Sequence, residues 1–274
     1  MSRLLKADLY RMWKSRLTLI ALILALAFPL FMVLLYVGIR AMSGLGDEML
    51  DAVSMFNANT VIGSCYSLTN NIGLVVPAFA GILVCTDYSN GTLRNKVIAG
   101  NRRSEIYLSH LIVTILFSVV IMTIYTGMTT VFSLLFLPFQ RDPSMNLARE
   151  VLYFVSYGTM TFVFIATVST LFAMTFRNAA PTIIFTIVLA LLLMILDTVV
   201  SLIDYSKYRY IIYAIPTFGA NFFTLNNMSI TALFSTAAQD PGPILYAEGM
   251  LSYVFFGVVN TVIGLLVFCQ RDVK

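Results

Sequence analysis

Six long stretches without a charged residue constrain this chain of 274 residues more than any other feature of its sequence. A helix that crosses the hydrocarbon of a bilayer needs about 20 apolar residues, and its backbone must bond within the helix because lipid offers it no partner. The stretches hold 19 to 35 residues each, and they lie between Arg16 and Arg40, Asp51 and Asp87, Glu105 and Arg141, Glu150 and Arg177, Arg177 and Asp197, and Glu248 and Arg271. One such stretch is compatible with a soluble core, but six predict an all-α integral membrane protein.

The overall composition agrees with this interpretation. Hydrophobic residues make up 59% of the chain and charged residues 11%, whereas a soluble domain carries roughly 25% charged residues. A soluble protein of this size would still need a polar surface, so the missing charges indicate a surface that faces lipid.

The six stretches predict the positions of the membrane spans within a single transmembrane domain, 1–274. The segment 210–239 is also uncharged, but Pro216 and several glycines and asparagines interrupt it, so we expect short re-entrant or interfacial helices there, within an outer loop 199–248. A seventh span in this segment would move the C-terminus to the opposite side. The six expected spans are 17–39, 61–86, 106–136, 151–176, 179–198 and 249–270.

The distribution of lysine and arginine predicts the orientation. Cytoplasmic loops of membrane proteins carry an excess of these residues. Twelve of the 17 lysines and arginines fall in one set of alternate segments, which are 1–16, 87–105, 177 and 271–274. We therefore expect a multi-pass protein of the bacterial cell membrane with both termini in the cytoplasm. The net charge of +4 reflects this topology and does not indicate a nucleic-acid partner.

The N-terminal residues 2–16 predict an amphipathic helix. Leu5, Leu9, Met12 and Trp13 share one face at helical spacing, and basic residues lie mainly elsewhere. Such a helix would lie in the lipid headgroup layer, anchored by Trp13 and its basic residues. The alternatives are an ordinary basic lead-in to the first span, or a helix that also contacts a cytoplasmic partner. The apolar stretch continues well past Ala27, so we expect an uncleaved first span and not a signal peptide.

Several catalytic classes lack the residues they need. The chain contains no G-x-x-x-x-G-K-[ST] loop, and the longest cytoplasmic segment, 87–105, is too short for a nucleotide-binding domain. A single histidine, His110, excludes H-E-x-x-H zinc chemistry, and we expect it to be solvated or bonded to its helix near the inner interface. Asp47 in a G-x-G-D match lies in an acidic outer loop. We therefore predict no catalytic, metal-binding or cofactor-binding residue in this chain.

Two functional alternatives to a transporter driven by ATP remain open. Ion-coupled secondary transporters usually carry a charged residue in the middle of a span, because it binds the driving ion there, and none of the six stretches has one. An intramembrane enzyme or a receptor would need titratable groups at depth or a large outer domain. Both alternatives are therefore less favoured by the sequence.

The segment 86–110 is the most distinctive part of the chain. Asn90-Gly91 predicts a turn, a short helix follows, Gly100-Asn101 predicts a second turn, and Ser104 is expected to cap the third span. Ordinary positive-inside charge explains its basic residues, but it explains less well the order of turn, helix, turn and cap. Those basic residues, which we expect to cluster just under the membrane, are Arg94, Lys96, Arg102 and Arg103.

This pattern resembles the permease subunit of type-two ABC exporters. Members begin with a cytoplasmic amphipathic helix, have six spans, and carry an acidic-x-x-x-G-T-[LI]-[RK] stretch between spans two and three. Here the stretch runs from Asp87 through Gly91, Thr92 and Leu93 to Arg94, followed by Lys96 and the small-residue turn. Many members have glutamate at the position of Asp87, a difference that keeps the charge.

The resemblance implies a mechanism and a set of partners. Two permease chains, identical or homologous, would form the pore, and two copies of a separate ATPase, which binds ATP and Mg, would dock beneath them. The second and fifth spans would line the path, and the implied cargo is a peptide, an antibiotic or another amphipathic molecule. The expected ATPase-coupling residues are Asp87, Gly91, Thr92, Leu93, Arg94, Lys96, Arg102, Arg103 and Glu105, and candidate path-lining or gating residues are Asn70, Asn71 and Pro77, for which a packing kink is the alternative.

Overall fold

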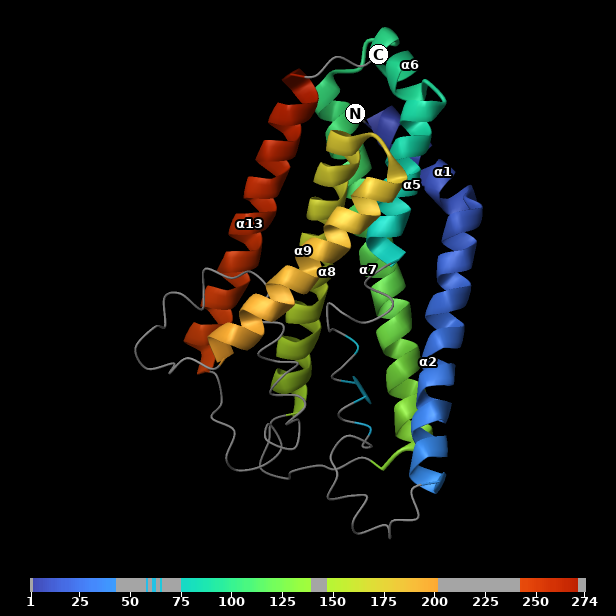
Figure 1. The fold of residues 1–274 in the computed structure, drawn as a ribbon, viewed down its shortest axis with the longest axis vertical. Helices are drawn as coiled ribbons and strands as arrows, with labels where there is room; N and C mark the ends of the chain where they lie inside the picture. Colours follow the sequence, from blue (N-terminus) through green and yellow to red (C-terminus); the bar gives the residue numbers. More distant parts are fainter. Residues whose placement is uncertain are drawn as a thin grey trace.

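A computed structural model describes residues 2–42, 58, 61–62, 65, 75–138, 147–201 and 242–270. The regular secondary structure in these ranges consists of α-helices. The helices, drawn in Figure 1, are α1 (Ser2–Lys14), α2 (Arg16–Met42), α5 (Val75–Ser89), α6 (Thr92–Ile98), α7 (Arg103–Phe136), α8 (Leu147–Phe176), α9 (Ala179–Ser201) and α13 (Gly242–Gln270).

Each predicted span contains a helix in the part of the chain that the structure describes, with somewhat different bounds. Four segments are long and apolar enough to cross a membrane: Arg16–Met42, Arg103–Phe136, Gly158–Phe176 and Met250–Gln270. Val75–Ser89 and Ala179–Leu193 are shorter apolar helices. The chain is therefore a multi-pass helical membrane protein, and the count of six spans stays a prediction.

Helices extend into both ends of the predicted outer loop 199–248, whose limits between the spans stay a prediction. Helix α9 continues to Ser201 and α13 begins at Gly242, so that α13 includes Glu248. An uncharged stretch marks only the part of a helix that lies in hydrocarbon, and a helix can continue beyond it where charges are solvated. The segment 210–239, Asn70 and Asn71 lie outside the described residues.

The bundle is organised around α7 and α8, which pack against each other. Helix α2 packs along α7 on one side, α13 packs along α8 on the other, and α5 contacts both α8 and α9 (Figure 1). Leucine, isoleucine, valine and phenylalanine side chains are exposed along the outer faces of α2, α9 and α13. These apolar faces are the surfaces that lipid would cover.

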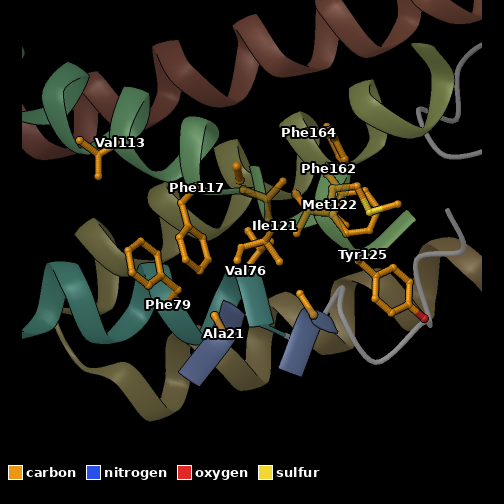
Figure 2. Close-up of a cluster of buried hydrophobic side chains, with 14 of the residues drawn as sticks. Ala21, Val76, Phe79, Val113, Phe117, Ile121, Met122, Tyr125, Phe162 and Phe164 are labelled. Atoms are coloured by element: carbon orange, nitrogen blue, oxygen red, sulfur yellow. The ribbon is translucent and has the colours of Figure 1, made fainter. Parts of the chain in front are cut away.

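Aromatic and aliphatic side chains fill the interior of the bundle (Figure 2). Phe79 of α5 stacks on Phe117 of α7 with 3.7 Å between ring centroids, and Phe162, Ile121 and Val76 surround them. Lipid is as apolar as these side chains, so close packing rather than removal from water holds such helices together. Many buried hydroxyls bond to backbone carbonyls of their own helix, as Thr114 does to His110 at 2.9 Å.

Helix α7 is longer than the membrane is thick. Its 34 residues span about 51 Å, whereas the hydrocarbon core is about 30 Å thick. One end of α7 therefore continues into a layer formed by α1 and α6, next to the end of α13 (Figure 1). There Arg103 donates a hydrogen bond to the Cys269 carbonyl at 3.0 Å.

Candidate functional site

Two glycines set the shape of the segment between α5 and α7. Gly91 has φ 66° and Gly100 has φ 87°, a left-handed region that residues with a Cβ rarely adopt. They lie on either side of α6, which confirms the predicted turn, helix and turn. Helix α7 begins at Arg103 after an extended Arg102. The expectation that Ser104 caps α7 was therefore wrong, because Ser104 lies inside its first turn.

Leu93 anchors α6 to the bundle. Its side chain is 1% exposed and lies in a cluster with Leu4 of α1, Ile106 and Tyr107 of α7, and Phe268 of α13. Side chains of three other helices thus share one buried cluster with a side chain of a seven-residue helix. A helix this short has little stability of its own, so this contact fixes where α6 sits.

A buried charged cluster lies beneath α6, built around Asp87 at the end of α5. Asp87 is 1% exposed, and the guanidinium of Arg11 in α1 donates to both its carboxylate oxygens, Nη2 to Oδ2 at 2.9 Å. Lys96 of α6 lies 3.0 Å from the same Oδ2, and Nε2 of His110 in α7 lies 3.2 Å from it. Four helices therefore meet at one carboxylate.

Asp8 of α1 completes this charged cluster. It is buried, its Oδ1 accepts a hydrogen bond from Lys96 at 2.8 Å, and its Oδ2 accepts one from the Ser109 hydroxyl at 2.7 Å. Its two carboxylates, Asp8 and Asp87, are matched by two cations, Arg11 and Lys96. We define the charged cluster as Asp8, Arg11, Asp87, Lys96, Ser109 and His110.

The charged cluster controls the ionisation of Asp87. Burial by itself would raise the pKa of this carboxyl, which follows the end of the predicted second span. Hydrogen bonds from His110 and Arg11, together with the positive charge of Lys96, outweigh burial and hold the pKa of Asp87 well below its usual range. Asp87 is therefore a carboxylate at neutral pH.

Three members of the charged cluster have the chemistry of metal ligands. One ligand atom each from Asp8, Asp87 and His110 lies within 4.8 Å of the other two. The Lys96 ammonium lies between them, 3.3 Å from Nε2 of His110 and bonded to both carboxylates. A protein cation thus fills the position that a metal ion would take.

The predicted coupling residues fall into two groups. Asp87, Leu93 and Lys96 point into the protein, and the Thr92 hydroxyl donates to the Asp87 carbonyl at 3.1 Å. Arg94 and Arg102 are exposed, as is Ile98 between them, whereas Arg103 and Glu105 are half-buried. The basic residues of this segment therefore do not form one cluster, because Lys96 lies on the inner face of α6.

The candidate path-lining residues have one member in the described part of the chain. Pro77 is buried in α5, which as described begins at Val75.

Sequence reasoning missed four of the six members of the charged cluster, Asp8, Arg11, Ser109 and His110. Met12 of the predicted face is buried and Leu5 and Leu9 are partly buried against the core, whereas Trp13 is 64% exposed. The buried face also carries Leu4 and Asp8, which the prediction did not include. His110 is fully buried and not solvated. One signal was present in the sequence, because Asp8 is the lone acid among the first 16 residues and shares a helical row with Leu4 and Met12.

The turn between α8 and α9 adjoins the same end of α5. Arg177 has φ 57°, and its guanidinium lies 5.5 Å from the centre of the Tyr88 ring. The Tyr88 hydroxyl donates to the Met174 carbonyl at 3.4 Å. The end of α5 is thus held by α8 as well as by α1 and α7.

Comparison with known proteins identifies the family. No curated protein matches the chain. A family model described as ABC-2 family transporter protein matches residues 4–193, a range that contains most of α1, all of α6 and the whole charged cluster. Since this match covers more than half of the sequence and agrees with the helical membrane fold, the chain belongs to the ABC-2 transporter family.

Proposed function

We propose that this protein is the permease subunit of an ABC exporter and that α6 is its coupling helix. Membership of the ABC-2 family implies an ABC transporter assembly with an ATPase partner. Two ATPase copies and a second permease chain would complete the assembly. The ATPase would bind ATP and Mg, while this chain would form the translocation path for a peptide, an antibiotic or another amphipathic molecule.

The observation that carries this proposal is the two-sided character of α6. Its inner side is fixed by Leu93 and Lys96, while Arg94, Ile98 and the following Arg102 are exposed, Ile98 to 72%. A large exposed apolar side chain flanked by two arginines is typical of a protein contact. A helix held at both ends by membrane helices cannot be displaced without displacing them.

Co-purification tests the proposal. The full chain is expressed with the ATPase encoded beside its gene, and Arg94→Glu with Arg102→Glu is compared with the wild type. We expect the double reversal to abolish co-purification, because it replaces two exposed cations next to Ile98. Arg3→Glu with Lys6→Glu is the matched control, since both residues are exposed on α1. Equal ATPase recovery from the wild type and the α6 variant would refute the coupling role.

An ion-coupled transporter is the second candidate, and the charged cluster is the observation that favours it. Buried carboxylates beside a histidine resemble a proton or ion site. The two carboxylates are, however, already bonded to Arg11 and Lys96, and they lie at the α6 end of the bundle. Transport by reconstituted protein that follows an ion gradient without ATP would support this candidate and not the exporter.

A further inference from the structure

The charged cluster joins α1 to helices that lie far from it in the sequence. Asp8 and Arg11 come from α1, and their partners Asp87 and Lys96 come from the end of α5 and from α6. Lys96 bonds to Asp8 and Asp87 at once, so it bridges α1 and α5 from its place on α6. Ser109 adds a bond from α7 to Asp8.

These bonds are costly to open one at a time. Asp8 and Asp87 are almost completely buried, and the Lys96 side chain is 16% exposed. Removing one partner from a buried pair leaves a charge without compensation, and this destabilises a protein far more than losing a surface pair. Helix α1 therefore stays in place on α6 while the charged cluster is intact.

Helix α1 is also fixed to α2. Ser15 is the single residue between them, its N–H donates to the Met12 carbonyl at 3.1 Å, and the Thr18 hydroxyl donates to the same carbonyl at 2.5 Å. The Thr18 N–H donates to the Ser15 carbonyl at 3.1 Å. Met12 and Thr18 are both buried, so the junction is a packed corner and a movement of α1 carries α2 with it.

We propose that α1 is a second arm of the coupling apparatus and that Asp8 and Arg11 are positioning residues that transmit displacement of α6 to α2. This inference rests on the proposed function, because α6 must first receive a force from an ATPase. A push on α6 then reaches the bundle by two routes. One runs directly into α7, and the other runs through the charged cluster and α1 into α2.

Amide hydrogen exchange on the full chain, reconstituted with its ATPase, separates the two routes. In the wild type, a non-hydrolysable ATP analogue is expected to change exchange in α1, in the first turns of α2 and at the α6 end of α7. The test variant is Arg11→Gln, because the Arg11 side chain is half-exposed and Lys96 still bonds to Asp87 when Arg11 is replaced. It is expected to speed exchange of α6 amides by about tenfold and to abolish the response of α1 and α2, while α7 still responds.

Two further variants sharpen the result. Arg11→Lys keeps the charge and is expected to restore part of the α2 response, which a purely structural defect would not allow. Lys6→Gln, an exposed position on α1, is expected to behave as the wild type. A full α2 response in Arg11→Gln would overturn the inference and leave the exporter assignment standing. A wild-type chain that binds no ATPase would overturn the exporter assignment itself, and the transmission route with it.

Discussion

Tyr107 of α7 directs its phenol ring against the backbone of Gly264 in α13. A Cβ placed on Gly264 would lie 2.6 Å from Cζ of Tyr107, which is buried. The two helices approach closely at this point because residue 264 has no side chain.

Gly264→Ala is therefore expected to destabilise the bundle. Overpacking of this kind costs about 1–3 kcal/mol, which predicts a lower thermal unfolding midpoint in detergent or nanodiscs. Gly257→Ala is the matched control, because a Cβ on this glycine of the same helix meets nothing within 4 Å. Tyr107→Phe should recover part of the loss in Gly264→Ala, and an equal effect of both glycine substitutions would contradict the argument.

Leu93→Ala is expected to release α6. Truncating a fully buried leucine costs about 2–5 kcal/mol, and here that loss falls on a helix of seven residues. The measurement is amide exchange over 92–98, which should accelerate while α8 is unchanged. Ile98→Ala, on the exposed side of the same helix, should leave exchange within α6 unaltered and instead weaken ATPase binding.

Asp87→Asn is expected to change how stability depends on pH. Because the folded pKa of Asp87 is lowered, its carboxylate contributes stability at pH values above its unfolded pKa of about 3.9, and this contribution is lost as the pH falls further. Asp87→Asn leaves Arg11 and Lys96 with less compensation, at a cost of about 3–5 kcal/mol at pH 7. Unfolding midpoints at pH 7 and at pH 3 should show a smaller gap between variant and wild type at pH 3. An equal gap at both pH values would mean that the carboxylate has no special stabilising role.

Lys96→Ala is expected to create a metal site. Asp8, Asp87 and His110 would keep a carboxylate and imidazole set that suits Zn²⁺, with the ammonium removed from between them. Added Zn²⁺ should raise the thermal midpoint of Lys96→Ala and leave that of the wild type unchanged. The further substitution His110→Ala should abolish the effect, and a zinc response that survives it would place the ion elsewhere.

The fluorescence of Trp13 can be used to test whether α1 lies in the lipid headgroup layer. It is the one tryptophan of the chain, and with the exposed Arg3, Lys6, Tyr10 and Lys14 it forms a face opposite to Asp8. If α1 lies in the headgroup layer, lipids brominated high on their acyl chains should quench Trp13 more than lipids brominated near the chain ends. Anionic lipids should strengthen this quenching relative to neutral ones. Absence of quenching by either lipid would place this face in water or against a protein.

The helices could be predicted because neighbouring residues in the sequence determine them. An uncharged run longer than a bilayer is thick predicts a helix without knowledge of its neighbours, and Gly91 and Gly100 mark the turns around α6 by their backbone freedom alone. The limits of helices were less predictable, since α13 continues through Glu248 once it leaves the hydrocarbon.

The charged cluster could not be predicted in this way, because its paired residues lie far apart in the sequence. Apolar periodicity assigns Asp8 to the solvent side of α1, and Arg11 and Asp87 are 76 residues apart. A charged residue can occupy a buried face of a helix if another element supplies the opposite charge. The sequence around Asp8 does not indicate that Lys96 is that partner. His110 was expected to be solvated or bonded to its own helix for the same reason.

The unbroken length of α7 has a mechanical consequence. From Arg103 to Phe136 it contains no proline and a single glycine, Gly127, so it has no evident joint at which to bend. A rigid rod of about 51 Å that tilts by about 5° moves its far tip by about 4 Å. A small rotation beside α6 would therefore appear, amplified by leverage alone, at the opposite surface of the membrane.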